Sequence, residues 1–134
     1  MSTNETKQYF DLHTTGIGYL NRVREVTPKE GESFLSITIA ALRGSVDNAQ
    51  YTHFECRVSG KQAQEIVRQL MPAVEGNLKV LIGFTLSDLF AESFTFKNGD
   101  KAGETGISLK ARLLRIAWAK VDGQPFYTAQ EDAA

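Results

Sequence analysis

Basic residues two positions apart occur in two separate segments of the sequence. Arg22 and Arg24 form one pair, and Lys110 and Arg112 form the other. Residues two apart project from the same face of an extended strand, so each pair is expected to point one way. Positive side chains grouped on strand faces are the arrangement that holds the phosphates of a nucleic acid.

Aromatic side chains join a basic one in a third segment, where apolar and polar residues alternate strictly. The alternation predicts that Tyr51, His53 and Arg57 share one face of a strand. Flat rings for stacking bases, beside positive charge for phosphates, are what sequence-independent binding of single strands requires. Glu55 shares this face and its carboxylate would repel phosphate, so we expect it to pair with Arg57 or Arg22.

Five further residues are candidates for the same binding role, and four of them have a competing structural explanation. Phe34 and Phe96 offer rings for stacking, although phenylalanine is usually buried in a core. Arg43 begins a loop and would otherwise be a solvated arginine, and Lys97 follows Phe96 in a predicted hairpin. Trp118 would stack on a base, cap the fold or join a subunit interface.

Residue patterns for catalysis or metal binding are missing. His13 and His53 lie in different segments without cysteine or aspartate at zinc-ligand spacing, so no metal site is expected. The sequence contains no phosphate-binding loop and no nucleophile elbow, and Gly16-Ile-Gly18 is too short for a dinucleotide fingerprint. We therefore expect no catalytic residue, no cofactor and no small-molecule substrate.

Composition places the chain in the class of small globular domains. Its 134 residues are 42% hydrophobic, which is enough apolar material for one core. The formal net charge is −1. The charge is uneven, because the segment from Gly106 to Val121 holds four positive residues and no negative one. Cys56 is the only cysteine, which excludes a disulfide framework. Neither a membrane-spanning run nor a signal peptide is recognisable, so we expect a cytoplasmic protein that does not bind membranes.

Periodicity predicts an order of strands interrupted by one helix. The segment 107–121 is the least certain strand, since its apolar residues would also line a helix, but the turn signals around it favour a strand. The predicted strands are 16–26, 33–41, 51–58, 78–84 with a further extended stretch at 90–96, 107–121 and a short last strand at 126–128; the helix is 60–70, ended by the segment 71–77.

Three strands, a helix and two long strands predict an all-β protein. The order is that of an OB-fold, a five-stranded Greek-key barrel with one helix between strands three and four. A generic α+β roll is the alternative. The predicted organisation is a flexible lead-in at 1–15, the barrel domain at 16–128 and a short tail at 129–134.

Three stretches of the chain resemble the bacterial single-stranded DNA-binding proteins, especially the divergent versions encoded by integrating conjugative elements and plasmids. The stretches are Gly18-Tyr-Leu-Asn21, Gly31-Glu-Ser-Phe-Leu-Ser-Ile-Thr-Ile-Ala40 and Thr52-His-Phe-Glu-Cys-Arg-Val-Ser-Gly-Lys61, and the resemblance spans about residues 16–118. It implies an OB-fold, replication or maintenance of a mobile element, and a stacking aromatic in the long hairpin that contains Phe94, Phe96 and Lys97.

The sequence departs from this family at two places. The family's strand-three tryptophan is replaced by His53, or by Tyr51 if the register shifts by two. The family's long Gly/Pro-rich linker and acidic tip are replaced by a short tail with only Glu131 and Asp132, so recruitment of enzymes through such a tip is not expected.

The expected function is therefore sequence-independent binding of single-stranded DNA or RNA by stacking and a basic groove. The expected assembly is a homodimer or homotetramer, because joined barrels gain affinity. The alternative is an OB-like protein-interaction module that dimerises or docks to replication or conjugation proteins without binding nucleic acid.

Overall fold

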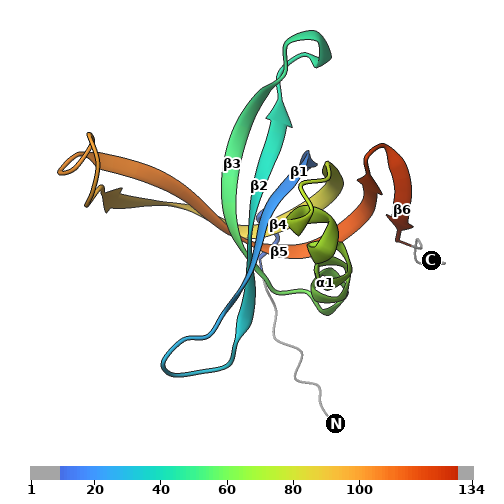
Figure 1. Ribbon diagram of the computed structural model, residues 1–134, viewed down its shortest axis with the longest axis horizontal. Coiled ribbons are helices and arrows are strands. Elements are labelled where there is room, and N and C mark those ends of the chain that lie inside the picture. The colour runs from blue at the N-terminus through green and yellow to red at the C-terminus, as the bar shows by residue number, and fades with distance from the viewer. Residues whose placement is uncertain (1–9, 130–134) are drawn as a thin grey trace.

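One continuous β-sheet and a single α-helix make up most of the molecule (Figure 1). The computed structural model describes residues 10–129. A 3-10 turn, η1 (Val46–Asn48), lies in the hairpin between the second and third strands. The remaining elements, in chain order, are β1 (His13–Val26), β2 (Phe34–Arg43), β3 (Gln50–Val58), α1 (Lys61–Glu75), β4 (Val80–Thr95), β5 (Thr105–Val121) and β6 (Gln124–Thr128).

The strand pairings close the first five strands into a ring. The sheet order is β3-β2-β1-β4-β5-β6, and an additional parallel pairing joins β3 to β5. The expected all-β class is confirmed. The sheet has six strands, not the five of the expected barrel, and the short last strand expected at 126–128 is β6. Asp122 and Gly123 adopt positive φ angles of 49° and 81°, a turn that folds β6 back against the end of β5 as a sixth strand.

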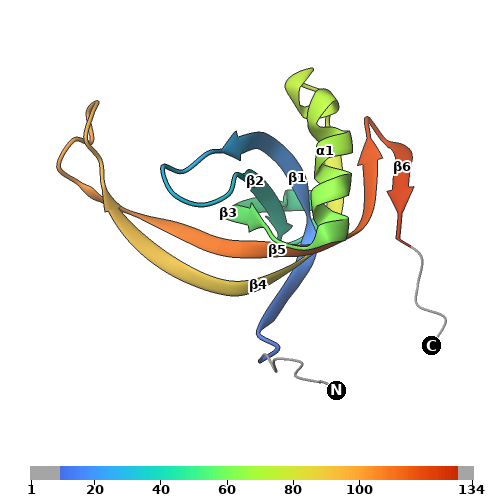
Figure 2. The same cartoon turned by 90° about the horizontal axis from the view of Figure 1, so that it is seen from below.

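The core fills the ring and extends under the helix. Inward side chains such as Ile39, Ile82 and Leu113 are almost completely buried. One face of α1 covers this core with its four buried residues, Ala63, Ile66, Val67 and Leu70, spaced as on one side of a helix. Figure 2 shows α1 against one end of the strands, on the side of β6.

Two elements are longer than the sequence predicted. The helix continues to Glu75 instead of ending at residue 70, with Pro72 inside it. A proline lacks one backbone donor, but here it lies in the last turns, where the Gly76 N–H still donates to the Pro72 carbonyl. Most of the segments 78–84 and 90–96 belongs to a single bent strand, β4, which runs from Val80 to Thr95 and also includes residues 85–89.

Other expectations agree with the structure more closely. The segment 107–121 is strand throughout and forms most of β5. β1 begins at His13, three residues before the expected start, and pairs there with Ser87 of β4. Residues 1–9 of the expected lead-in and 130–134 of the expected tail lie outside the described residues. None of the helices within 10–129 has the length and apolar character needed to cross a membrane.

Long hairpins extend from the ring and define its outer surface (Figure 1). The β2–β3 hairpin and the β4–β5 hairpin point in different directions, and the loop between β1 and β2 points in a third. We call the outer part of the β4–β5 hairpin, residues 90–107, the arm. The two hairpins and the β1–β2 loop start from the same region of the ring. In that region the outer surface of the sheet is formed by β1, β2, β3 and β5.

Candidate nucleic-acid interface

A β-bulge in β1 determines which way its two arginines point. Leu20 pairs with Ile39 and Arg22 with Thr38, so the register shifts at Asn21. A bulge inserts one residue into a strand and re-aims the side chains that follow. Leu20 therefore faces the core before the bulge, while Arg22 and Arg24 both project outward after it.

Three arginines lie in one row across the outer surface of the sheet. Arg24 pairs with Ser36, Ser36 with Arg57, and Arg57 with Arg112. The last pairing places two positive side chains directly opposite each other on parallel strands, an arrangement that costs stability unless an anion or another partner neutralises it. Arg112 has the Asp88 carboxylate 3.4 Å away, whereas the ion pairs found among residues 10–129 do not include one from Arg57, which is thus suited to a phosphate.

The neighbouring row adds two further cations and one carboxylate. Arg22 pairs with Thr38, Thr38 with Glu55, and Glu55 with Lys110. We call the five cations of the two rows the basic face: Arg22, Arg24, Arg57, Lys110 and Arg112.

Glu55 lies within the basic face, but its partner differs from the one expected. The Thr38 hydroxyl lies 3.0 and 3.1 Å from its two carboxylate oxygens and donates to them. The ion pairs found among residues 10–129 do not include one from Glu55 to Arg57 or Arg22. The arginines beside it therefore keep their charge available at the surface.

A second bulge, in β4, brings an aromatic ring to the basic face. Ser87 pairs with Arg112 and Phe90 with Lys110, so the register shifts around Asp88. Asp88 has a φ of 55°, and its carboxylate lies 3.4 Å from the Arg112 guanidinium in an exposed ion pair. Phe90 is consequently turned outward next to Lys110 and is 53% exposed.

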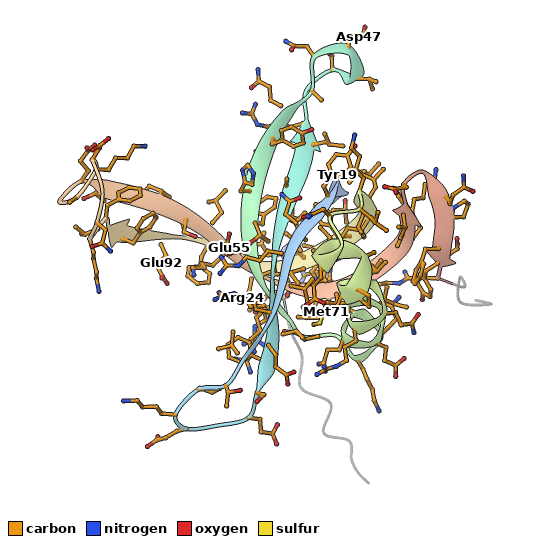
Figure 3. The ribbon with its side chains drawn as sticks, viewed as in Figure 1. Tyr19, Arg24, Asp47, Glu55, Met71 and Glu92 are labelled. Atoms are coloured by element: carbon orange, nitrogen blue, oxygen red, sulfur yellow. The ribbon has the colours of Figure 1, made fainter. Side chains whose placement is uncertain are left out.

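A hollow of ≈ 420 Å³ runs between these side chains. Arg24, Arg57 and Arg112 line it together with the rings of Phe34 and Phe90. The Arg57 guanidinium lies 4.2 Å from the centre of the Phe34 ring, a cation–π contact that holds both groups at the surface. In Figure 3, Arg24 and Glu55 lie at the centre of the molecule, where the hairpins converge.

Three aromatic side chains form a cluster farther along the same surface. The ring centres of Tyr19 and Tyr51 are 6.4 Å apart, and those of Tyr51 and His53 are 6.5 Å apart. Tyr19 and His53 both pair with Ala40, which places them in adjacent positions on either side of β2. We call Tyr19, Tyr51 and His53 the aromatic cluster.

The arm carries a second aromatic group on the side continuous with the basic face. Phe94 pairs with Gly106, four residues from the pairing of Phe90 with Lys110. The rings of Phe94 and Phe96 meet edge to face at 4.9 Å and cover Gly106, where a side chain would collide with both. The Lys101 ammonium lies 5.6 Å from the Phe96 ring centre.

Three of the predicted site residues lie away from the basic face. Trp118 packs over Gly83 on the outer side of β4, in the half of β5 that pairs with β6. Arg43 lies on the core side of the β2–β3 hairpin and donates to the Thr52 hydroxyl at 3.0 Å. Lys97 is exposed in the loop at the end of the arm.

The remaining nine predicted residues lie along one surface that runs from the aromatic cluster over the basic face to the arm: Arg22, Arg24, Phe34, Tyr51, His53, Arg57, Phe96, Lys110 and Arg112. Sequence reasoning omitted Tyr19, Phe90 and Lys101 from this surface. Tyr19 precedes the β1 bulge and Phe90 follows the β4 bulge, and a strict alternation of faces does not reveal either position.

Comparison with known families places the chain in one family. A family model described as "Protein of unknown function (DUF3577)" matches residues 3–134. The chain belongs to the DUF3577 family. No curated protein matches the sequence. The family match covers every residue of the basic face, the aromatic cluster and the arm, and it assigns none of them a role.

Proposed function

We propose that the protein binds single-stranded DNA without sequence specificity, through the basic face and the rings beside it. The observation that carries the proposal is the row of Arg24, Arg57 and Arg112, which three different strands place in one line at the surface, with Ser36 of β2 between the first two. Such a row follows a phosphate backbone, while Phe34 and Phe90 offer faces on which bases stack.

The topology of the barrel supports the same proposal. We propose an OB-fold, since the pairing of β1 with β2 and β4, the parallel β3–β5 pairing and a helix between β3 and β4 are the arrangement expected of it. OB-folds bind oligonucleotides on the face of strands two and three and through the loops after strands one and four. Here β2 and β3 carry Phe34 and Arg57, and the loop after β4 is the tip of the arm.

The resemblance to single-stranded DNA-binding proteins of conjugative elements and plasmids supports a cytoplasmic role in replication or maintenance of a mobile element. The proposal includes a homodimer or homotetramer, since linked sites raise affinity for one strand. The side of the arm opposite the basic face exposes Ile107, which offers an apolar contact for such an assembly. Light scattering after gel filtration tests this part, and a monomer at every concentration would contradict it.

The decisive experiment is fluorescence anisotropy of a labelled dT 20-mer at low salt. The double variant Arg57→Ala/Arg112→Ala is expected to bind at least tenfold more weakly than the natural sequence. The matched control is Arg115→Ala/Lys120→Ala, which removes the same charge from the half of β5 beside β6. Equal losses in both variants, or no binding by the natural protein, would contradict the proposal.

A protein-interaction module is the second candidate, and exposed Ile107 on the arm is the observation that favours it. The same titration separates the two functions. A protein that docks only to other proteins leaves the anisotropy of the labelled strand unchanged, whether or not the arm is altered.

A further inference from the structure

A cleft of ≈ 450 Å³ opens at the end of the binding surface that lies away from the arm. Its walls are the aromatic cluster on one side and, on the other, the turn that leads from α1 to β4. Figure 3 shows Tyr19 beside this turn, with Glu92 of the arm on the opposite side of the molecule. The volume lies within the range of roughly 300–1,000 Å³ that is typical of small-ligand pockets.

The floor and walls of the cleft suit a flat, weakly polar ring. Ala40 lies between Tyr19 and His53, and the half-exposed Leu78 and the partly buried Val74 contribute apolar surface from the opposite wall. The Tyr19 and Tyr51 rings are tilted by 52° to each other, so together they form an open angle, not a closed stack. Tyr51 is 48% exposed, which leaves ring surface for a ligand to stack on.

Two asparagines line the cleft, one at a β-bulge and the other at a positive φ angle. Asn21 is the extra residue of the β1 bulge, a device that re-aims a side chain. Asn77 follows the helix with a φ of 62°, in the left-handed region that asparagine tolerates better than most residues. An asparagine amide offers one donor and one acceptor side by side, the pattern that pairs bidentately with adenine.

We propose that this cleft receives one base of the bound strand and prefers adenine there. The inference rests on the proposed function, because the cleft shares Tyr51 and His53 with the binding surface and is continuous with it. The basic face binds any sequence, whereas the cleft adds a preference at one end of the site. A base that leaves the strand stacks on the tyrosines and directs its polar edge to the asparagine amides.

The test compares a dT 12-mer with 12-mers carrying a single dA, dG or dC at each position in turn. Adenine at one end position is expected to raise affinity about fivefold over thymine, and adenine elsewhere is expected to have no effect. Asn77→Gly should abolish that gain without unfolding the protein, because glycine accepts the positive φ. Gln69→Ala, on the exposed side of α1, is the matched control and should retain it.

The outcomes separate this inference from the proposed function. If the dT 12-mer binds and all substituted strands bind equally, or if another base is preferred, the adenine cleft is wrong while single-strand binding stands. If the gain survives Asn77→Gly but Asn21→Ala abolishes it, with unchanged thermal unfolding, the inference also holds. If no strand binds at all, the proposed function itself fails.

Discussion

The acidity of the Cys56 thiol depends strongly on the burial and charge around it. Its side chain is 2% exposed within the core, and this burial, together with the negative charge of Glu55, raises the pKa of the thiol to about 12 from 9.0. The thiolate that reacts with electrophiles therefore does not form in the folded protein near neutral pH. A thiol reagent should label Cys56 only after denaturant unfolds the chain.

The same pKa shift predicts how stability depends on pH. In the unfolded chain the Cys56 thiol loses its proton near its ordinary pKa of 9.0. In the folded protein the thiol keeps its proton until the pH approaches the raised pKa of about 12. The folded state consequently binds more protons between the two values, and the free energy of unfolding falls as pH rises above about 9. The loss amounts to about 1.4 kcal/mol by pH 10.

Urea denaturation at pH 8 and pH 10 measures this loss. Cys56→Ala is the control, since it lacks the titrating group and should lose less between the two pH values, although it is less stable at both. Parallel losses in the two proteins would show that other groups cause the pH dependence.

Glu55 is the residue at which charge on the basic face can be changed without changing shape. Glu55→Gln keeps an oxygen that accepts from the Thr38 hydroxyl and removes the negative charge beside Lys110. Affinity for a dT 20-mer is expected to rise about three- to tenfold, because phosphate no longer meets a carboxylate there. Glu65→Gln, on the exposed side of α1, is the matched control and should leave affinity unchanged. Unchanged affinity in Glu55→Gln would place the strand elsewhere.

At the scale of elements, the two bulges explain both the success and the limits of sequence-based prediction. Alternation in β3 correctly placed Tyr51, His53 and Arg57 on one face, because that strand pairs without a register shift. The shifts in β1 and β4 exchange the two faces part-way along the strand. The resulting positions of Tyr19 and Phe90 depend on pairing partners far away in the chain, which periodicity does not contain.

Other elements also divide into those that local sequence predicts and those that depend on contacts between distant residues. The turn signals around 107–121 were sufficient to predict a strand there. Pro72 predicted a helix end, yet tertiary contacts extend the helix, since Val74 packs against the core beyond it. The arginine row could not be predicted as a row, because the parallel β3–β5 pairing that completes it joins residues more than fifty positions apart.

The arm is an element whose role can be tested apart from the core. Gly106→Ala would place a methyl carbon 2.6 Å from Phe94 and 2.9 Å from Phe96, so both rings must move. Affinity for a dT 20-mer is expected to fall about threefold to tenfold, since stacking contributes ~1–3 kcal/mol per base. The melting temperature should change little because the arm lies outside the core.

The control for this variant is Thr95→Ala, at a pairing position on the other side of the arm. It should leave binding unchanged. If Gly106→Ala binds normally, the two rings pack against each other for structural reasons and do not contact the strand.

For the whole molecule, the formal net charge of −1 makes the response to salt informative. A protein that is uniformly positive attracts nucleic acid from a distance, whereas the proposed function would rest on five cations gathered on one face of this protein. Each contact between a cation and a phosphate releases counterions, about 0.7 per contact on a single strand. If all five engage, the logarithm of the binding constant should fall with the logarithm of salt concentration with a slope of about −3.5.

Titrations of a dT 20-mer between 50 and 200 mM salt should therefore show about a 100-fold loss of affinity. In Arg57→Ala/Arg112→Ala the slope should flatten to about −2, because two of the contacts are gone. A change in affinity with an unchanged slope would mean that these arginines position other groups and do not contact phosphate. A slope near zero in the natural protein would mean that binding is apolar, since counterion release accompanies every phosphate contact.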